Sequence, residues 1–422
     1  MTADAEPCTP GTHPERWVQT FSDDFNGTSL DTTKWEAATD SRQGGKSTWD
    51  PTEVSVGNGL LRLGITKVVD PATGAIRYDC GAVRGRKGYT TQYTFKQKYG
   101  YYEARYKLPA RIDKDYWASF WLMAGPVIST EDTRVGMEID IMESFTFDRP
   151  VHTANFHWGG YGEKHNKYSL DCGTWPKQQV LNPSGAYHVF GLYWDKDLYV
   201  FYLDGVEIGR TNMIGLGSTA NGLEASRGTT QAEGYMLLSC EASTWPGDNS
   251  QNWDADAPAQ DEFLVDYVRV YDLKPAFATD PVIGNEGAEN TAYQDSLASS
   301  ATDVSGGVLA FAKVSGPAWL SVAADGSLSG TPSASDRGAN RFEVSVSDGI
   351  STVQGALHIT VKSAFEVWSS GSTAIFGGDG NGDGVADGVA WLLGSASPGQ
   401  SANGLLPAAR RSGDGGCTLS FN

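Results

Sequence analysis

Long apolar runs are missing from this sequence. No segment approaches the roughly 20 consecutive apolar residues that span a bilayer, and residues 1–14 lack the apolar core of a signal peptide. We therefore expect no membrane insertion. The first residues are typical of a mature or engineered N-terminus, so the missing signal does not argue against a protein that is secreted, periplasmic or held at a bacterial cell surface.

Cysteine motifs for metal binding are missing too. The chain has five cysteines, none in a CxxC spacing, and their odd number leaves at least one unpaired within the chain. Disulfides are possible in an oxidising compartment, but the sequence does not give their connectivity. The five are Cys8, Cys80, Cys172, Cys240 and Cys417.

Positive charge is scarce. The 32 basic residues face 51 acidic ones, and the net charge of -19 argues against nucleic acid or an anionic membrane as a partner. Aromatic residues and glycine are abundant instead, with 13 Trp, 18 Tyr, 16 Phe and 51 Gly. This composition suits a turn-rich β protein whose flat rings stack on sugars, although most of these rings are expected in the core. Neutral glycans and metal cations are the partners that remain.

Short alternating segments separated by turn signals run through residues 15–273, for example YGYYEARYKL and FLVDYVRVY. Long helical periodicity is absent, so we predict an all-β fold with two packed antiparallel sheets of jelly-roll type. Residues 274–289 are predicted to be a linker. Residues 290–362 resemble bacterial Ig-like and cadherin-like modules, a second and smaller β-sandwich without a constellation of catalytic residues.

The C-terminal segment, residues 363–422, contains the sequence DGNGDGVADG. Its spacing of oxygen side chains can wrap one calcium ion, but Ala390 stands where an EF-hand loop has glutamate. The segment therefore matches dockerin-like or thrombospondin-like calcium loops, whose ligand pattern is less strict than that of an EF-hand. The alternative to a calcium site is a flexible acidic tail. The segment ends in TLSFN, which is typical of a strand cut short. The predicted ligands are Asp379, Asn381, Asp383 and Asp387.

The most informative segment is GMEIDIMES, residues 136–144, in which acids alternate with large apolar residues. Alternation places Glu138 and Asp140 on one face of a strand, whereas Glu143 would point the other way. A β-bulge at Ile141 or Met142 would return Glu143 to the face of Glu138. We therefore predict a row of three carboxylates on one face.

Such a row raises some carboxyl pKa values, because like charges repel. Hydrolysis of a glycosidic bond with retention needs one ionised nucleophile and one protonated acid about 5–5.5 Å apart. We assign Glu138 as the nucleophile, Glu143 as the general acid and then base, and Asp140 as the residue that holds the nucleophile and tunes both. The alternative is a solvated acidic strand face, which the apolar neighbours disfavour.

The motif ExDxxE in EIDIMES resembles the signature of glycoside hydrolase family 16, whose fold is a concanavalin-like β-jelly roll. The resemblance covers about residues 17–271 and extends to FSDDFNGTSLDTTKW, YGYYEARYKLPA, SFWLMAG and VDYVRVY. Because it has an extra residue between Asp140 and Glu143, the chain resembles the bulged branch of this family. That branch contains laminarinases, agarases, carrageenases and porphyranases. A lichenase-like specificity is correspondingly disfavoured.

This resemblance also implies substrate-binding residues. Trp121 resembles the aromatic floor of the site, and His157 in NFHWGGYG resembles a histidine near the acid/base. Further stacking candidates are Trp117, Trp158 and Trp245, and for each of these tryptophans packing in the core is the alternative. Arg84 in RGRKG is a candidate for contacting substrate sulfate groups.

Family members commonly hold one structural calcium ion away from the catalytic strand, and the matching positions here are Asp24, Gly59 and Asp266. Calcium is thus expected as a structural and not a catalytic ion. The overall expectation is a monomeric retaining endo-hydrolase of a β-linked polysaccharide, with a laminarin-type β-1,3-glucan as the leading substrate. An algal galactan is the alternative substrate, and a glycan-binding protein without catalysis is the alternative class.

Overall fold

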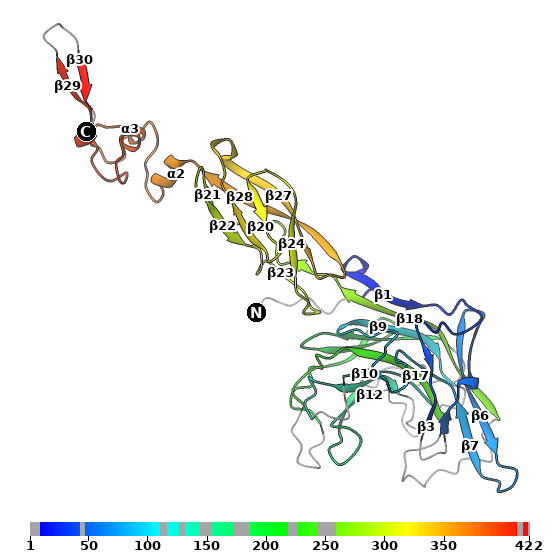
Figure 1. Cartoon of the computed structure of the whole chain (residues 1–422). Helices are drawn as coiled ribbons and strands as arrows, with labels where there is room; N and C mark the ends of the chain where they lie inside the picture. Colours follow the sequence, from blue (N-terminus) through cyan, green and yellow to red (C-terminus); the bar gives the residue numbers. More distant parts are fainter. Residues whose placement is uncertain are drawn as a thin grey trace. The chain divides into compact units, whose positions relative to one another are not determined.

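The structure is a computed structural model that describes residues 9–42, 47–109, 116–125, 131–143, 153–172, 186–217, 226–242, 259–411 and 417–420 (Figure 1). Cys8 and Trp245 lie outside these ranges. The chain divides into two compact units with a boundary between Lys274 and Pro275. No helix in the described ranges is long and apolar enough to span a bilayer.

The first unit contains an 11-stranded sheet in which β18 pairs with β1, β6 and β9. The opening and closing strands of the unit, β1 and β18, are thereby hydrogen-bonded neighbours. Its strands are β1 (Trp17–Asp23), β3 (Asp40–Arg42), β4 (Ser47–Trp49), β5 (Val54–Gly57), β6 (Leu60–Val69), β7 (Ile76–Cys80), β9 (Gly100–Lys107), β14 (His188–Trp194), β15 (Tyr199–Leu203), β16 (Val206–Thr211) and β18 (Gln260–Leu273).

A second sheet of the same unit has seven strands in the order β13-β12-β11-β10-β17-β8-β2. The predicted catalytic strand is β11, an interior strand hydrogen-bonded to β10 on one side and β12 on the other. The strands are β2 (Glu36–Ala37), β8 (Ala82–Arg84), β10 (Tyr116–Ala124), β11 (Met137–Glu143), β12 (Thr153–Trp158), β13 (Asn166–Asp171) and β17 (Gly234–Ala242).

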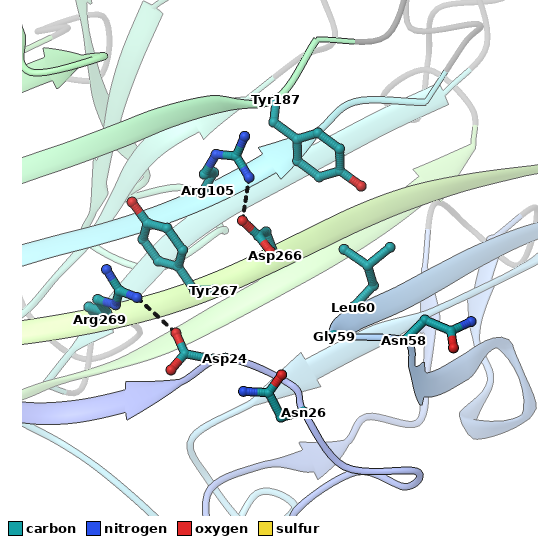
Figure 2. A pocket seen from close by; sticks show the side chains of 10 residues that line it. All are labelled: Asp24, Asn26, Asn58, Gly59, Leu60, Arg105, Tyr187, Asp266, Tyr267 and Arg269. Atoms are coloured by element: carbon teal, nitrogen blue, oxygen red, sulfur yellow. Dashed lines mark hydrogen bonds and ion pairs between the residues drawn. The ribbon is translucent and has the colours of Figure 1, made fainter.

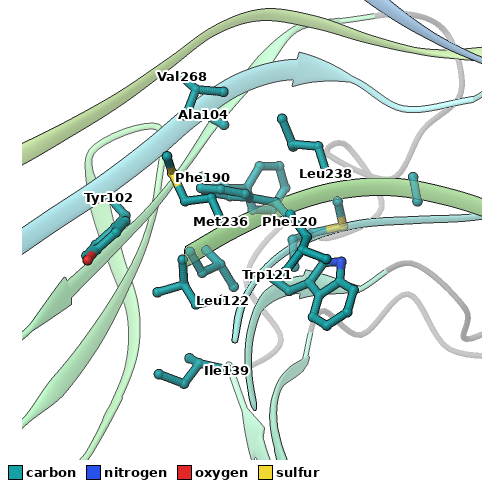
Figure 3. Packing of buried hydrophobic residues seen from close by; sticks show 14 of the residues in the cluster. Tyr102, Ala104, Phe120, Trp121, Leu122, Ile139, Phe190, Met236, Leu238 and Val268 are labelled. Atoms are coloured by element: carbon teal, nitrogen blue, oxygen red, sulfur yellow. The ribbon is translucent and has the colours of Figure 1, made fainter. Parts of the chain in front are cut away.

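The main hydrophobic core lies between these two sheets. Figure 3 shows Phe120, Leu122 and Ile139 of the seven-stranded sheet packed with Tyr102 and Phe190 of the 11-stranded sheet, all almost fully buried. Alternation explains this packing, because every second residue of β10 and β11 points into the core and the others point to the opposite face. The predicted jelly-roll sandwich is confirmed, and the residues predicted as catalytic lie on the face turned away from the core.

The second unit begins with an Ig-like β-sandwich. It is built from β19 (Ala276–Phe277), β20 (Val282–Ile283), β21 (Gly287–Ala288), β22 (Tyr293–Ser296), β23 (Ala301–Thr302), β24 (Ala310–Ser315), β25 (Leu320–Val322), β26 (Ser327–Gly330), β27 (Gly338–Ser347) and β28 (Thr352–Lys362). Its core contains Phe311, Phe342, Leu357 and Ile359. The remainder of the unit contains α2 (Ala364–Trp368), α3 (Asp387–Leu392), β29 (Ala408–Arg411) and β30 (Cys417–Ser420).

The segment 274–289, which we expected to be a linker, instead contributes three short strands to the second unit. β20 and β21 both pair in parallel with β28, and β19 pairs with β23. The physical reason is that β28 offers unpaired backbone groups along one edge, which these dipeptide strands satisfy. The segment 363–422 belongs to the same compact unit as the Ig-like sandwich.

Cys80 and Cys240 are buried free thiols of the first unit. The Sγ of Cys80 lies 3.3 Å from the hydroxyl of Ser47, and burial raises the pKa of both thiols. These two side chains therefore act as small apolar core residues and not as nucleophiles.

Candidate active site

A bulge in β11 brings the third carboxylate to the face of the other two. Along β10, Ser119 and Trp121 are two residues apart and so share a face, and they lie opposite Glu143 and Asp140 respectively. Phe120 lies opposite Met142, which leaves Ile141 as the extra residue in β11. The register shift predicted from the odd spacing of the acids is thus confirmed.

The strand on the other side of β11 leads to the same conclusion. In β12, Asn155 lies opposite Asp140 and Thr153 lies opposite Glu143. The amide Nδ2 of Asn155 donates a hydrogen bond of 2.5 Å to Oε2 of Glu143. Because a side chain across from Asp140 contacts Glu143, the two acids must occupy the same face.

Burial dominates the electrostatics of the row. Glu138 and Asp140 are 8% and 2% exposed, whereas Glu143 at the end of the strand is less covered. Burial raises the pKa of Glu138 to about 7, and the charge of Glu143 adds to this effect. Burial also raises the pKa of Glu143 to about 7. Two buried carboxyl groups that titrate together near neutral pH can hold one proton between them.

Asp140 favours its protonated form most strongly of the three. Burial and the charges of Glu143 and Glu138 raise its pKa well above the usual range. A hydrogen bond between Asp140 and Glu143 raises the pKa of Asp140 further and lowers that of Glu143.

The hairpin loop between β12 and β13 places Tyr161 over Glu138. Its hydroxyl donates a hydrogen bond to Oε2 of Glu138, which lowers the pKa of Glu138 against the effect of burial. Gly159 and Gly160 turn this loop with φ of +78° and +76°. A Cβ atom at Gly159 would lie 2.1 Å from the carbonyl oxygen of Lys164, so the turn requires glycine there.

His157 lies directly across from Glu138 in the β11–β12 ladder. Its Nε2 is 3.5 Å from Oδ2 of Asp140, and its Nδ1 is 2.8 Å from Nε2 of His165. The two imidazole rings stack with an interplanar angle of 9°. Burial lowers the pKa of His157 to about 3, so the ring is neutral near neutral pH. The structure places this histidine against Glu138 and Asp140, and its place near the acid/base stays a prediction.

A fourth carboxylate, Glu241 of β17, lies on the same face. It stands across from Trp117, which is two residues before Ser119 in β10. Its Oε1 accepts a hydrogen bond of 2.8 Å from Nε of Arg42, and the guanidinium group of Arg42 stacks over the ring of Trp49. Arg42 also lowers the pKa of Glu138, so it supplies the site with a positive charge.

The predicted substrate-binding aromatics have different outcomes. Trp117 and Trp121 lie on the face of the carboxylates, each 8% exposed, and Nε1 of Trp121 donates to Oγ of Ser239 at 3.2 Å. Trp158 is 1% exposed and belongs to the main core, so its expected role as a sugar platform is wrong. It follows His157 in β12, and alternation turns it inward.

Arg84 lies on the face of the seven-stranded sheet that carries the carboxylates, across from Leu237, which in turn lies across from Trp121. Its Nη2 donates a 2.7 Å hydrogen bond to Oε1 of Glu36, and its side chain is almost fully buried. A sulfate group would have to compete with Glu36 for this guanidinium group.

The three residues predicted to hold the structural calcium ion line one pocket on the 11-stranded sheet (Figure 2). Asp24 pairs with Arg269 at 2.9 Å and Asp266 pairs with Arg105, each through one carboxylate oxygen. The other oxygens and the backbone carbonyl of Gly59 are donors of the kind that calcium prefers. The pocket lining consists of Asp24, Asn26, Asn58, Gly59, Leu60, Arg105, Tyr187, Asp266, Tyr267 and Arg269.

In the predicted calcium loop of the second unit, the acidic side chains accept hydrogen bonds from backbone N–H groups. Asp383 accepts hydrogen bonds from the backbone N–H of Val385 at 2.9 Å and of Ala402 at 2.6 Å. Asp387 is buried, and Gly384 has φ of +84° at the sixth position of the motif. The loop is thus closed on itself by hydrogen bonds, and calcium binding by Asp379, Asn381, Asp383 and Asp387 stays a prediction.

Several residues of the site were not predicted from the sequence. Alternation in β12 could have identified Asn155, because it shares a face with His157. The GGYG turn next to the predicted histidine was a signal for Tyr161. No local signal pointed to the contact between Arg42 and Glu241, which are 199 residues apart in the chain.

Comparison with known proteins gives two family matches. The family model described as "Beta-porphyranase A-D, GH16 domain" matches residues 16–273, and the model of a bacterial Ig domain matches residues 272–360. Together they cover the first unit and the Ig-like sandwich of the second.

Individual relatives are more distant. The chain is 32% identical to beta-porphyranase E of Zobellia galactanivorans over 206 residues, which are 45% of this chain and 67% of that protein. It is 29% identical to endo-1,3-1,4-beta-glycanase ExsH of Rhizobium meliloti over 216 residues, 46% of this chain and 42% of that protein. The chain spans about half the length of ExsH and of EglC from the same bacterium, 42% and 52%.

A solved structure, the endo-beta-1,3-glucanase of Pyrococcus furiosus, is 24% identical and aligns with a TM-score of 0.45. The alignment covers 61% of this chain and 95% of that one.

Proposed function

The chain belongs to glycoside hydrolase family 16, and from this premise we propose that it is a retaining endo-glycanase that cleaves a β-linked polysaccharide. The observation that carries the proposal is the bulge at Ile141, which sets Glu138, Asp140 and Glu143 in one row. A retaining mechanism needs a nucleophile and an acid/base side by side on one face.

In the first step, Glu138 attacks the anomeric carbon while Glu143 gives its proton to the leaving glycosidic oxygen. A covalent glycosyl ester on Glu138 results, and the chain beyond the scissile bond leaves with the proton. In the second step, Glu143 takes a proton from water, whose oxygen attacks the anomeric carbon and releases Glu138. Both steps invert the anomeric carbon, so the product keeps the β configuration.

The neighbours supply the protonation states that this mechanism needs. The hydrogen bond from Tyr161 and the charge of Arg42 favour ionised Glu138, the nucleophile. Glu143 keeps a raised pKa because it is buried, which favours the protonated acid near neutral pH. After the first step, the hydrogen bond from Asn155 stabilises the carboxylate left on Glu143.

For the substrate we propose a β-linked algal galactan of the porphyran type. The support is the match of residues 16–273 to the beta-porphyranase model and the 32% identity to beta-porphyranase E. The sequence favours a laminarin-type β-1,3-glucan, and the identity to relatives named beta-glucanase and glucan endo-1,3-beta-glucosidase A1 keeps this as the second candidate.

The decisive experiment incubates the full chain with porphyran, agarose, carrageenan, laminarin and mixed-linkage glucan and sizes the products. We expect an oligosaccharide ladder from porphyran, and NMR of the first products should show the β anomer. Glu138→Gln and Glu143→Gln should lose roughly 10²–10⁴-fold or more of the rate, whereas Glu163→Gln, an exposed change in the nearby loop, should not. Wild-type turnover by Glu138→Gln, or initial release of the α anomer, would refute the mechanism.

We further propose that the enzyme acts outside the cell as a monomer and that calcium in the pocket of Asp24, Gly59 and Asp266 stabilises the catalytic unit. The bacterial Ig match supports the first point, because such modules are common in exported proteins. The oxygen donors of the pocket support the second. Calcium takes no part in the chemical steps, which are performed on the other sheet.

A further inference from the structure

The carboxylate row and the neighbouring imidazole together have the make-up of a metal site. Glu138, Asp140 and His157 each offer one ligand atom, and these atoms lie within 4.8 Å of one another. In the described ranges of the chain, this is the single such group of three or more histidine, cysteine, aspartate or glutamate side chains. Nitrogen and oxygen donors together suit a borderline divalent cation such as Zn²⁺ better than calcium or magnesium.

Two of these ligand atoms face each other without a hydrogen bond. Oδ2 of Asp140 is buried and has no hydrogen-bond partner, and the residue is 2% exposed. It lies 3.5 Å from Nε2 of His157, beyond the usual hydrogen-bond range. A buried polar atom without a partner is costly, and a cation between the two atoms would satisfy both.

The separation matches the geometry of a bound ion. Zn–N and Zn–O bonds are about 2.0–2.2 Å, so two ligands at the tetrahedral angle lie roughly 3.3–3.6 Å apart. The 3.5 Å between Nε2 of His157 and Oδ2 of Asp140 falls in this interval. These two ligand atoms therefore need little movement to bind zinc.

His165 orients the imidazole for this role. Nδ1 of His157 is 2.8 Å from Nε2 of His165, and a hydrogen bond donated by Nδ1–H leaves the lone pair of Nε2 directed at Asp140. Histidine ligands of metals are held in this way, with the second ring nitrogen donating to a neighbouring group. The stacked rings fix the plane of His157 as well.

We propose that Zn²⁺ binds to Nε2 of His157 and to one oxygen each of Asp140 and Glu138, and that the bound ion blocks substrate. The ion would occupy the carboxylate that attacks the anomeric carbon, so inhibition is competitive with the polysaccharide. Only this inhibitory step rests on the proposed function, because the binding of zinc can be measured without any substrate.

The binding test is calorimetric titration of the chelator-treated full chain with Zn²⁺ in excess Ca²⁺, which fills oxygen-only sites. We expect one zinc per chain, with affinity reduced more than about tenfold in His157→Gln and in Asp140→Asn. His188→Gln is the matched control, since His188 also contacts an aspartate, Asp204 at 2.7 Å, but away from the site. Circular dichroism of each variant verifies folding, and equal zinc affinity in wild type and both folded site variants would overturn the proposal.

The inhibition test adds Zn²⁺ to the hydrolysis of whichever polysaccharide is cut. We expect the apparent KM to rise with zinc while kcat stays constant, and the same concentration of Ca²⁺ to have no effect. Zinc binding that depends on His157 supports the site even if no polysaccharide is hydrolysed, and then only the proposed function fails. Hydrolysis that is unaffected by zinc, together with no binding, would overturn the metal site alone.

Discussion

Replacing the proposed nucleophile should make the protein more stable. In Glu138→Gln a neutral amide of nearly the same shape replaces a carboxyl group that is 8% exposed and whose pKa burial raises to about 7. The amide oxygen can still accept the hydrogen bond from Tyr161, while the amide avoids the desolvation of a charge. Activity and stability should therefore change in opposite directions.

The sign follows from proton binding. A free glutamate has a pKa of about 4.3, so the folded state binds this proton more tightly than the unfolded state. The unfavourable contribution of Glu138 is absent below the unfolded pKa, grows as the pH rises from about 4 to about 7, and is constant above that. This difference in pKa, at about 1.4 kcal/mol per unit, corresponds to on the order of 3–4 kcal/mol at pH ~8.

The assay is differential scanning calorimetry of wild type and Glu138→Gln at pH ~4 and ~8. We expect the unfolding midpoint of the catalytic unit to rise by several degrees at the higher pH and to change little at the lower pH. The transition of the Ig-like unit serves as an internal reference, and Glu163→Gln controls for the loss of an exposed charge. A variant that is destabilised equally at both pH values would refute the reasoning.

Four further predictions test the site and the loops. Tyr161→Phe should raise the pKa of Glu138 and move the acidic limb of the pH–rate profile upward, since a hydrogen bond to a charge contributes ~1.5–3 kcal/mol; an unchanged limb would count against this contact. The wild-type pH–rate profile should be bell-shaped with its maximum near neutrality, because burial raises the pKa of both glutamates to about 7. Deleting Ile141 and Met142 together should abolish hydrolysis by turning Glu143 toward the core, whereas deleting Ile141 alone leaves a regular strand with Glu143 on the face of Glu138 and should retain it; retained activity in a folded double-deletion variant would disprove the need for a shared face. Calcium titration should show a site that Asp383→Asn removes, and identical titrations of the two proteins would eliminate the tail loop as a calcium ligand.

The parts of the site that one strand determines could be predicted from the sequence. Alternation and one odd spacing were sufficient to expect the face of Glu138 and Asp140 and the bulge before Glu143, because both are properties of consecutive residues. The same rule, applied to β12, would have turned Trp158 into the core, since it follows His157. The core packing that was the alternative for Trp158 is therefore the one that strand alternation favours.

Contacts between distant segments could not be predicted. Arg42 and Glu241 meet across 199 residues, and no periodicity in either segment indicates the pairing. The linker was misjudged for a related reason, because the strands β20 and β21 are two residues long and pair with β28 some 75 residues later. Dipeptide strands carry no alternation of their own, and the edge that receives them determines their structure.

The loop that carries Tyr161 connects β12 to β13, the outermost strand of its sheet, whereas the acids it covers belong to an interior strand. Insertions at such a border disturb one ladder of hydrogen bonds, while a change within β11 would disturb two. The loop that carries Tyr161 should therefore tolerate insertions and substitutions better than β11, which carries the three acids. Variation at the exposed positions Gly162 and Glu163, with Gly159, Tyr161 and His165 kept, should therefore change the border of the carboxylate row without altering β11.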